Sequence, residues 1–595
     1  MTLGPAPFVL LDDARAGGAP ARLYRNPVEV VTAGTPGAVA PALERLRAAV
    51  DAGRHAAGYL AYQAGAALVV GAPTRGAGDL LWFGLFDGYE EIAAADVAAR
   101  LPDPAGAWAG PVVPQVARRD YEAKLARVLE LIAAGDIYQA NLTFAADVAV
   151  LGDPLALYAR LRRAAGAGYG ALIDTGAVRL LSLSPELFFS LERGVLTCRP
   201  MKGTARRDAD PAVDRGLAAE LAGDPKQRAE NLMIVDLMRN DVSQVALAGS
   251  VAVPELFALE SYPTVHQLTS TVTATLAPGR DAIDVLSALF PCGSITGAPK
   301  RRAMEVIAEI EDEPRGVYTG AIGRIDPDDG SGTGDAMFNV AIRTLELAHG
   351  TPTARLGLGS GVVADSHPRD EWAECLAKAA FVTAGQRGFD LIETMAFDPV
   401  AGIALLDRHL ARMKASAAAF GFAFDRHEAR NELQAATFRL REARRVRLVL
   451  APGGAIAIEI AQLPATPPAP VAIAIVPLPV APTDFRLAHK TSNRRFYDAA
   501  RAAAGTSEVV FEDAAGRLTE GSFTSLFVER DDVLLTPPAG RGLPGVLRAE
   551  LLASGRAVEA ELTSADLTDG FFIGNALRGL IPALVAPAKP AIAAL

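Results

Sequence analysis

Apolar and polar positions follow helix-like and strand-like periods in turn along the first part of the chain. In the stretches 224–240 and 368–380 the apolar residues recur at helical spacing, and in the first of them Leu232, Val235 and Met238 fall on one stripe. Such a stripe is typical of an amphipathic helix that packs one face against a core. We therefore expect a helix in each of the two stretches.

A β-hairpin is predicted between these helices and the N-terminus. Two strand-like runs, residues 179–190 and 195–199, flank a two-residue turn that ends in glycine, which is typical of a tight hairpin. If the pairing continues in register, Glu186 lies opposite Met201 and next to Lys202, so that a carboxylic acid and an amine meet. Taken alone, such a pair is typical of an exposed cross-strand ion pair.

The hydrophobic pattern is interrupted by the glycines of residues 385–388, and a new strand-like run begins at Phe389. We place a domain boundary between residues 385 and 386. Beyond it, residues 445–463 predict another hairpin. The proline-rich stretch 464–482 predicts a linker between two lobes. The second part of the chain therefore has a layout of its own.

Length and composition are those of a folded protein with more than one domain. The chain has 595 residues, of which 50% are hydrophobic and 21% charged. This length exceeds what one hydrophobic core usually supports. The longest apolar stretches contain prolines and are shorter than the ~20 residues of a spanning helix, and the N-terminus lacks the pattern of a secretory signal. We expect a cytoplasmic protein that does not enter a membrane.

Charge and cysteine content exclude several other classes of protein. The formal net charge is -11 and no long basic tract is present, so binding to nucleic acid is disfavoured. Cys198, Cys292 and Cys375 are an odd number without CxxC spacing, which argues against a disulfide framework or a zinc site. An acidic protein that binds a dianionic substrate needs local arginine, lysine or a metal ion, and such residues are present.

A series of motifs lies before the boundary: GDIYQANLT (135–143), SLSPELFF (182–189), RPMKGTARR (199–207), ENLMIVDLMRND (230–241), VHQLTSTV (265–272), GSITGAPKRRAMEVI (293–307), RGVYTGAIG (315–323) and GSGVVADSHPRDEWAECLAKA (359–379). With these motifs the chain resembles the chorismate-utilising enzymes over roughly residues 7–385. The KGT sequence at Lys202 is similar to aminodeoxychorismate synthase component I in particular.

The resemblance implies a reaction in which Lys202 acts as a nucleophile. Lys202 would add at ring carbon 2 of chorismate while Glu186, as general acid, protonates the departing 4-hydroxyl group. Ammonia would then add at carbon 4 and expel the lysine. Anthranilate synthases, which place nitrogen at carbon 2, typically carry alanine at the position of Lys202, so the lysine determines the position of amination.

The resemblance also implies a Mg²⁺ site made of Glu230, Glu371 and Glu374. Glu371 and Glu374 are three residues apart, and carboxylate oxygens are ligands that Mg²⁺ prefers, although such ExxE pairs are usually solvated surface. By the resemblance, Glu230 and Glu374 bind the metal and Glu371 supports it through water. Related enzymes often carry another acid three residues before the first ligand, where this chain has Gln227.

Further residues are placed around the chorismate pocket by the resemblance: His266, Ser294, Tyr318, Arg343, Gly359 and Gly361. Of these, Tyr318 and Arg343 would hold the enolpyruvyl carboxylate. Taken alone, His266 is more typical of a packed core histidine. The two glycines lack a Cβ, so their backbone can approach a carboxylate closely. A tryptophan site present in some relatives is not expected, because the LLES-like strand reads LLDD here.

The second half contains another series of motifs: FDLIETM (389–395), LLDRHLARM (405–413), HKTSNRRFYDAAR (489–501), LTEGSFTSLFV (518–528), LPGVLRAELL (543–552) and FIGNALRGLIP (572–582). With these motifs it resembles the class IV aminotransferases that use pyridoxal 5'-phosphate, most closely the aminodeoxychorismate lyases. Where relatives usually read asparagine after the TEG motif, this chain has Ser525.

The class IV resemblance assigns each requirement of the cofactor to a residue. Lys490 would bind the aldehyde and move protons, and Glu520 would hold the pyridine nitrogen protonated. Arg412 and the backbone amides of Gly545 and Val546 would bind the phosphate, the amides from the start of a helix. Further substrate contacts are Thr394, Asn575 and Arg578.

Together these resemblances predict a mixed α-β (α+β) protein of two domains. Residues 1–385 would form a two-sheet domain like anthranilate synthase component I, and residues 386–595 a two-lobed class IV domain. The predicted function is synthesis of 4-aminobenzoate, a folate precursor, by amination of chorismate and elimination of pyruvate. Two alternatives for the second domain are an amino-acid transaminase and an inactive cofactor-binding scaffold.

Ammonia is expected from a separate glutamine amidotransferase subunit. None of the three cysteines lies in a GxCxG elbow, so the chain shows no glutaminase site. A homodimer through the C-terminal domain is compatible with the class IV resemblance.

Overall fold

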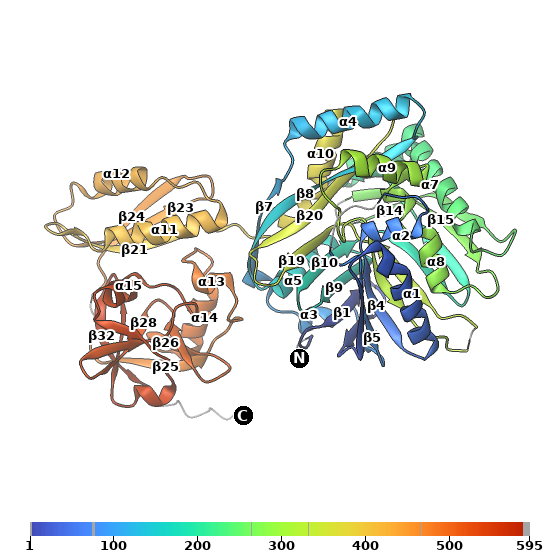
Figure 1. Cartoon of the computed structure of the whole chain (residues 1–595). Helices are drawn as coiled ribbons and strands as arrows, with labels where there is room; N and C mark the ends of the chain where they lie inside the picture. Colours follow the sequence, from blue (N-terminus) through green and yellow to red (C-terminus); the bar gives the residue numbers. More distant parts are fainter. Residues whose placement is uncertain (1–2, 74–77, 263–264, 331, 466, 587–595) are drawn as a thin grey trace. The chain divides into compact units, whose positions relative to one another are not determined.

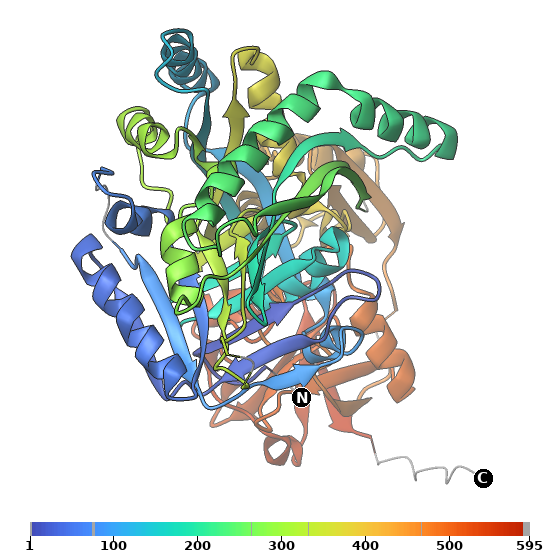
Figure 2. The ribbon, with the colours of Figure 1, turned by 90° about the vertical axis from the view of Figure 1, so that its right-hand side faces the viewer.

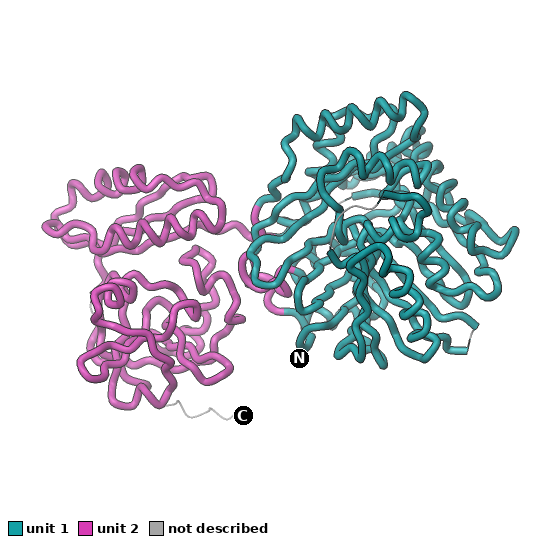
Figure 3. Tube along the Cα trace, viewed as in Figure 1, with its two compact units in different colours: residues 1–101, 111–150, 158–385 teal, residues 102–110, 151–157, 386–595 magenta. Residues whose placement is uncertain are grey.

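The computed structural model describes residues 3–73, 78–262, 265–330, 332–465 and 467–586. The chain forms two compact units (Figure 3). Unit 1 contains residues 1–101, 111–150 and 158–385, and unit 2 contains residues 102–110, 151–157 and 386–595. Two short segments from the first half of the sequence therefore belong to unit 2.

The first sheet of unit 1 has ten strands and is antiparallel along its main order (Figure 1). β7 (Ala107–Pro114) pairs with β8 outside the main order. The main order is β16 (Gly297–Ala298), β8 (Gln139–Gly152), β20 (Thr353–Val362), β19 (Thr344–Ala348), β10 (Val178–Ser184), β9 (Tyr169–Asp174), β1 (Phe8–Asp12), β2 (Ala21–Arg25) and β6 (Glu90–Ile92).

The second sheet of unit 1 is also ten-stranded. β14 (Ala252–Ser261) pairs with β15 outside the main order. The main order is β13 (Met201–Arg206), β15 (Val265–Thr275), β12 (Val195–Arg199), β11 (Leu187–Glu192), β18 (Ala336–Val340), β17 (Ala321–Ile325), β4 (His55–Leu60), β5 (Leu81–Phe86) and β3 (Glu29–Ala33).

Both faces of the second sheet are covered. Tyr59 and Ile322 from this sheet pack with Val9 and Ile173 of the first sheet in one hydrophobic cluster. The opposite face packs against α1, α7 and α8 in a larger cluster. Because both faces are covered, the strand β5 reads as an unbroken apolar run, LWFGLF, and all six of its residues are buried.

The helices in the first 385 residues cover the sheets and carry part of the site. They are α1 (Pro36–Asp51), α2 (Gly65–Leu68), α3 (Val97–Arg100), α4 (Arg118–Ala133), α5 (Pro154–Ala165), α6 (Pro211–Gly223), α7 (Pro225–Ser243), α8 (Ala282–Leu289), α9 (Lys300–Ile310) and α10 (Pro368–Lys378). α7 packs against β13 and β15 (Figure 2). The side chain of Asp224 accepts two backbone N–H groups at its start, which explains where the helix begins.

The two predicted helices are confirmed as α7 and α10, but the predicted stripe on α7 is wrong in one position. Val235 and Met238 are each 1% exposed, whereas Leu232 is 43% exposed. Ile234 takes its place in the buried face, which also contains the polar Asn231. The apolar positions alone misplaced the buried face of α7, because this face includes the polar Asn231.

The predicted hairpin exists as β11 and β12, but its register does not extend to Glu186. Ser190 pairs with Thr197 as expected, and a bulge then shifts the register so that Leu187 faces Arg199. The run 179–190 is two strands, because β10 and β11 belong to different sheets. Glu186 lies in the break between them and has no ladder pair on β13, so the predicted cross-strand pairing with Met201 is wrong, although the Met201 backbone N–H donates a hydrogen bond to the Glu186 carboxylate.

The first lobe of unit 2 is a four-stranded sheet with two helices. The order is β22 (Gly402–Ile403), β21 (Leu391–Asp398), β23 (Arg444–Leu450) and β24 (Ile456–Gln462). Figure 1 shows α11 (Leu406–Phe420) and α12 (Arg426–Thr437) beside it. The predicted hairpin of residues 445–463 is confirmed as β23 and β24.

The second lobe is an eight-stranded mixed sheet. Its order is β27 (Leu518–Gly521), β26 (Glu508–Glu512), β25 (Val471–Pro477), β32 (Gly579–Val585), β31 (Phe571–Asn575), β28 (Ser525–Arg530), β29 (Val533–Thr536) and β30 (Ala557–Glu559). The helices of this lobe are α13 (Phe485–Ala488), α14 (Arg495–Ala504) and α15 (Val546–Ala553).

The prediction that the proline-rich stretch 464–482 is a linker is wrong for its central part. Its central part is the strand β25, which pairs in parallel with both β26 and β32. Val471 and Ile473 are buried in the core of this lobe. The prolines flank the strand or stand at its end, where no ladder hydrogen bond is lost.

Cys198, Cys292 and Cys375 are buried free cysteines in the structure. Among the described residues, none of the helices combines the length and apolar character that crossing a bilayer requires.

Candidate active sites

Unit 1 contains a cavity of about 490 Å³ whose walls carry most of the predicted site residues. They come from several elements, including α7, α10, β13 and β20. The predicted residues that line the cavity are Glu186, Lys202, Glu230, Ser294, Tyr318, Arg343, Gly359, Gly361, Glu371 and Glu374. The structure therefore brings together side chains that are up to 188 residues apart in the sequence.

Glu186 and Lys202 face this cavity from different elements. Glu186 is 4% exposed, and its Oε1 accepts a 2.7 Å hydrogen bond from the hydroxyl of Ser294. Burial raises the pKa of Glu186, while Ser294 and the charge of Lys202 oppose this shift. Burial and the nearby charge of Lys378 lower the pKa of Lys202. Both shifts favour the neutral forms, an acid with its proton and an amine with its lone pair.

The amine of Lys202 rests against the backbone of Gly361. A Cβ added at Gly361 would lie 2.9 Å from Lys202 Nζ and 2.9 Å from Gln139 Nε2. Gln139 is 1% exposed, and its Oε1 has no hydrogen-bond partner among the described residues. Sequence reasoning missed Gln139, although it lies within the GDIYQANLT motif. The absence of a side chain at position 361 thus leaves the space that the lysine amine occupies.

Replacing Gly361 by alanine is expected to lower activity while leaving the fold intact. The atoms that the new methyl group meets are the ends of two flexible side chains, so we expect a loss of stability of no more than about 1 kcal/mol. Displacing the Lys202 amine by about 1 Å is expected to lower kcat by about 10²-fold. Steady-state kinetics and thermal unfolding of Gly361→Ala measure the two effects.

The matched control for this variant is Gly388→Ala, because a Cβ there meets nothing within 4 Å. Wild-type kcat in Gly361→Ala would show that the space beside Lys202 is not needed.

The cavity wall carries three carboxylates and two lysines close to them, namely Glu230, Glu371, Glu374, Lys202 and Lys378. Burial raises the pKa of Glu230, and the carboxylates of Glu371 and Glu374 add to that effect. Burial would also raise the pKa of Glu374, but the charge and hydrogen bond of Lys378 lower it overall. Lys378 Nζ lies 2.7 Å from Glu374 Oε1 and donates a 3.0 Å hydrogen bond to the carbonyl of Gly359.

The carboxylates of this wall can hold Mg²⁺ only if oxygen atoms of water or substrate supply the remaining ligands of the metal. The described residues contain no group of three His, Cys, Asp or Glu side chains arranged to hold a metal ion. Ser366 Oγ donates a 2.6 Å hydrogen bond to Glu371 Oε1, which orients that carboxylate. Mg²⁺ prefers carboxylate oxygens and commonly keeps several waters. The residues present therefore fit a metal held by one or two carboxylates.

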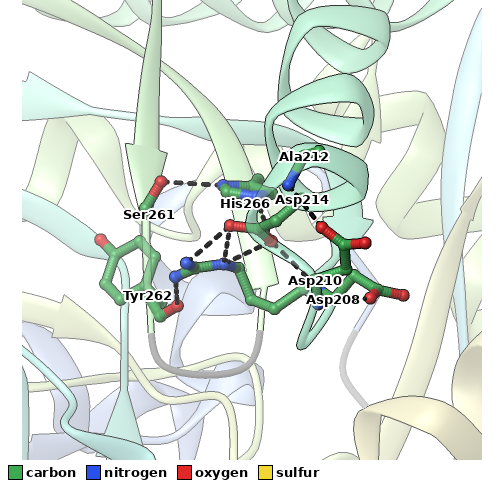
Figure 4. Close-up of polar contacts among 8 residues, drawn as sticks. Asp208, Asp210, Ala212, Asp214, Ser261, Tyr262 and His266 are labelled. Carbon is green, nitrogen blue, oxygen red and sulfur yellow. Dashed lines mark hydrogen bonds and ion pairs between the residues drawn. The ribbon is translucent and has the colours of Figure 1, made fainter.

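His266 does not reach the cavity, contrary to the prediction. It lies on β15 between Val265 and Gln267, both of which line the cavity, and neighbouring residues of a strand point to opposite faces. Figure 4 shows its ring between Ser261 and Asp214 instead. Nδ1 lies 2.8 Å from Ser261 Oγ, and Nε2 lies 3.0 Å from Asp214 Oδ1. His266 is thus a hydrogen-bonded, buried histidine that ties α6 to the second sheet.

Tyr318 and Arg343 both line the cavity. The ring of Tyr318 covers Gly357, where a Cβ would lie 2.0 Å from the Tyr318 Cγ. Arg343 adopts a φ of 50°, a left-handed conformation that is unusual for a residue with a side chain. Burial lowers the pKa of Arg343, and none of the described carboxylates forms an ion pair with it. Arg343 is therefore a cation available to an anionic ligand.

Unit 2 contains a second cavity, of about 550 Å³. It is lined by residues of both lobes. The predicted residues among its walls are Thr394, Arg412, Lys490, Glu520, Gly545, Val546, Asn575 and Arg578. All of the residues assigned to the pyridoxal phosphate site from the sequence therefore face one space.

Lys490 and Glu520 are the strongly shifted groups of this cavity. Burial and the charge of Arg412 lower the pKa of Lys490 to about 7. Burial raises the pKa of Glu520 to about 7, against a 2.5 Å hydrogen bond from the Tyr497 hydroxyl and a 2.9 Å bond from the Leu543 amide. An amine that can lose its proton near neutral pH and a buried, oriented carboxyl group are what pyridoxal phosphate requires.

Arg412 is held by a buried network that sequence reasoning missed. Glu393 accepts a 2.8 Å hydrogen bond from Arg412 Nε and one of 2.7 Å from Nη2, and its Oε2 lies 2.6 Å from Nδ1 of His409. Glu393 and His409 are each 1% exposed. Burial would raise the pKa of Glu393, but Arg412 and His409 lower it to about 2. Glu393 lies within the FDLIETM motif, between Ile392 and Thr394, which both face the cavity. An acidic residue in the inward position of an alternating strand was the sequence signal that could have identified this network.

Glu393→Gln is expected to destabilise unit 2 by about 3 kcal/mol at pH 7, because it leaves Arg412 buried without its carboxylate. The folded-state pKa of about 2 lies below the ordinary value of 4.5. The ionised carboxylate therefore stabilises the fold above about pH 4.5, and this contribution is lost as the pH falls toward 2. Urea unfolding of wild type and variant at pH 7 and pH 3 tests this.

For this prediction Glu442→Gln is the control, because Glu442 forms an ion pair with Arg444 but is 73% exposed. Its stability should match that of wild type within about 1 kcal/mol. If the free energy of unfolding of wild type and that of Glu393→Gln differ as much at pH 3 as at pH 7, the assigned pKa is contradicted.

The start of α15 completes the anion-binding part of this cavity. Gly545 is the residue before the helix, and Val546 is its first residue, so their backbone N–H groups are free of helical partners. A Cβ at Gly545 would lie 2.5 Å from Ser525 Oγ, which shows how closely the two segments approach. Arg412 Nη1 donates a 3.0 Å hydrogen bond to the carbonyl of Pro544 beside them.

Two protein families match the two parts of the chain. The model described as chorismate binding enzyme matches residues 8–384. This chain belongs to the chorismate-binding enzymes. The model described as amino-transferase class IV matches residues 390–585. These matches confirm the predicted mixed α-β fold, with an N-terminal two-sheet part and a C-terminal class IV part.

Individual relatives match the chorismate-binding part. Aminodeoxychorismate synthase component 1 of Salmonella typhimurium is 44% identical over 261 residues, 44% of this chain and 56% of the relative. Anthranilate synthase component 1 of Haloferax volcanii is 40% identical over 259 residues, 43% of this chain and 48% of that protein. The chain thus spans about half the length of these curated relatives.

A solved structure shares the fold. Anthranilate synthase component I from Streptococcus pneumoniae is 26% identical, with a TM-score of 0.52, and the match covers 64% of this chain and 93% of that one. Relatives named as two different synthases, aminodeoxychorismate synthase and anthranilate synthase, are therefore almost equally similar to this chain.

Proposed function

We propose that this chain makes 4-aminobenzoate from chorismate and ammonia at two sites. A domain of residues 1–385 would aminate chorismate at carbon 4, and a domain of residues 386–595 would eliminate pyruvate and form the aromatic ring. The observation that carries this proposal is the amine of Lys202 in the unit 1 cavity, beside the buried acid Glu186. An enzyme that aminates carbon 2 has no use for that amine.

In the first reaction Lys202 is the nucleophile and Glu186 the general acid. Lys202 attacks carbon 2, the ring double bonds shift, and the 4-hydroxyl leaves as water with a proton from Glu186. Ammonia then attacks carbon 4, and the amine of Lys202 leaves from carbon 2. Arg343 and Tyr318 hold the enolpyruvyl carboxylate. Ser294 donates to Glu186 and so orients the acid.

Glu230 and Glu374 would bind Mg²⁺, with Glu371 acting through water. The metal would neutralise the ring carboxylate of chorismate and draw electrons toward it. Lys378 pairs with Oε1 of Glu374, which leaves the other oxygen of this carboxylate for the metal.

In the second reaction Lys490 moves the protons. Pyridoxal phosphate, when bound, supplies an electron sink for the carbon that carries nitrogen. Lys490 takes the proton from ring carbon 4 and returns one to the departing enolpyruvyl group, a task that suits a pKa of about 7. Glu520 holds the pyridine nitrogen, and Arg412 and the amides of Gly545 and Val546 hold the phosphate. Thr394 contacts the substrate.

A separate glutamine amidotransferase subunit would supply the ammonia, as the designation component 1 of the Salmonella relative suggests. We further propose a cytoplasmic protein of folate-precursor synthesis, with a homodimer through the C-terminal domain.

The test is product analysis of the purified chain loaded with pyridoxal phosphate. With chorismate, Mg²⁺ and ammonium salt we expect 4-aminobenzoate and an equal amount of pyruvate, and with glutamine in place of ammonium we expect neither. Anthranilate as the product would overturn the first assignment. Accumulated 4-amino-4-deoxychorismate, together with transamination of amino acids, would show that the second domain is a transaminase.

A further inference from the structure

The short turn that carries Ser294 also carries a buried thiol. Cys292 directly precedes the 3₁₀ helix η3 (Gly293–Ile295). Ser294 and Ile295 line the unit 1 cavity, whereas Cys292 is not one of the described residues that line it. The thiol is nevertheless next to the site, and Cys292 and Ser294 are 4% and 3% exposed. The proposed reaction gives this thiol no task so far.

The turn is held from both sides, so that the side chains of Cys292 and Ser294 stay in contact. Gly293 packs against α7, where an added Cβ would overlap the side chain of Leu237. Thr296 Oγ1 donates a 2.8 Å hydrogen bond to the carbonyl of Cys292. The Sγ atom of Cys292 then lies 3.2 Å from Ser294 Oγ, in a hydrogen bond.

The thiol and the hydroxyl form a chain of hydrogen bonds that ends on the general acid. Ser294 has one hydroxyl proton, which it donates to Glu186 Oε1 at 2.7 Å. Burial and the charge of Glu186 raise the pKa of Cys292 to about 12, so the thiol keeps its proton. The sulfur already accepts the backbone N–H of Ser294. The S–H group is therefore the donor to Ser294 Oγ.

The direction of this chain matters because a carboxylic acid carries its proton on one oxygen only. A Ser294 hydroxyl that is free to turn can accept as well as donate. Glu186 could then give a proton on Oε1 to Ser294 instead of to the substrate. A Ser294 that always donates excludes this arrangement and leaves the proton to Oε2. The backbone N–H of Met201 is a second donor to the same carboxyl group.

We propose that Cys292 is a positioning residue for the general acid Glu186. Its S–H group donates to Ser294, Ser294 donates to Glu186 Oε1, and Glu186 Oε2 carries the proton that the departing hydroxyl receives. This proton moves to the hydroxyl oxygen while the bond between carbon 4 and that oxygen breaks. The bonding electrons leave with the oxygen as water, and the protons of Cys292 and Ser294 stay in place.

This inference rests on the proposed role of Glu186, but it does not depend on which ring carbon receives nitrogen. Amination at carbon 2 and amination at carbon 4 both release the 4-hydroxyl group as water. Total consumption of chorismate therefore reports on the acid in either case.

A double-mutant cycle tests whether Cys292 acts through Ser294. The purified full chain receives chorismate, Mg²⁺ and ammonium salt, and total chorismate consumption gives kcat and KM. Cys292→Ala should lower kcat about tenfold, a part of the roughly 10²- to 10⁴-fold that a general acid supplies. KM should stay within about twofold, because no contact with the substrate is lost. In the Ser294→Ala background the same change should alter kcat by less than about twofold, because the hydroxyl that Cys292 orients is already absent.

Two further variants separate the hydrogen bond from packing. Cys292→Ser keeps a donor at this position and should hold kcat within about threefold of wild type. Cys198→Ala is the matched control, because Cys198 is 0% exposed and packs in the same hydrophobic cluster as Cys292. It lies on β12, whose residues are all described and do not line the cavity. Cys198→Ala should lose about as much thermal stability as Cys292→Ala and keep the kcat of wild type.

Wild-type kcat in Cys292→Ala would overturn the proposal. So would an equal loss of kcat in both backgrounds, or a Cys292→Ser variant as slow as Cys292→Ala. Failure of the proposed function is a separate outcome: a chain that makes anthranilate would refute amination at carbon 4, and the cycle would still decide the role of Cys292. A chain that consumes no chorismate would overturn both.

Discussion

Lys202→Ala is expected to abolish amination at carbon 4, with a loss of kcat on the order of 10⁴-fold or more, because the covalent nucleophile is removed. The change opens space in a cavity rather than in a packed core, so thermal unfolding should stay close to that of wild type. The measurement is the rate of 4-amino-4-deoxychorismate formation from chorismate and ammonium.

Lys202→Arg is the control for charge in this experiment. It keeps a cation near Glu230 and Glu374, but a guanidinium group stays protonated and cannot act as an amine nucleophile. Lys202→Arg should therefore be as inactive as Lys202→Ala. Trace nitrogen transfer to carbon 2 in Lys202→Ala would support the assignment. Unchanged 4-amination in either variant would refute the nucleophilic role of Lys202.

Lys490→Ala is expected to lose the visible absorption of the bound cofactor and to stop the second reaction. Fed chorismate and ammonium, this variant should accumulate 4-amino-4-deoxychorismate and release little pyruvate, because no group remains to move the proton of ring carbon 4. Liquid chromatography with mass detection measures both products. Formation of 4-aminobenzoate at the wild-type rate would show that the lyase assignment is wrong.

Mixing the two full-length variants provides the matched control. Lys202→Ala retains the second site and Lys490→Ala retains the first, so together they should restore 4-aminobenzoate although neither makes it alone. Failure of the mixture would mean that one substitution damages both sites or that the intermediate does not pass through solution.

The periodic patterns predicted those parts of the fold that depend on local order. α7, α10 and the hairpin of β23 and β24 were found as expected. Where a distant partner determines the outcome, the patterns failed. Leu232 reads as a core residue but is exposed, and residues 471–477 read as part of a proline-rich linker but form the strand β25 between two partners from elsewhere in the chain.

The sequence by itself determined which chemical groups this protein has: a lysine in a KGT motif, acids at 186, 230, 371 and 374, and the lysine, glutamate and arginine of a class IV site. Only the tertiary structure decided which of them meet. Glu186 reaches the cavity because the chain passes from one sheet to the other at this residue, and not because of the register of the hairpin. His266 points away from the cavity because neighbouring residues of a strand face opposite sides, and its ring contacts Asp214 instead. The tertiary structure also revealed Glu393 behind Arg412. Such contacts join residues far apart in the chain, and their geometry depends on the packing of whole sheets, which no local pattern of residues encodes.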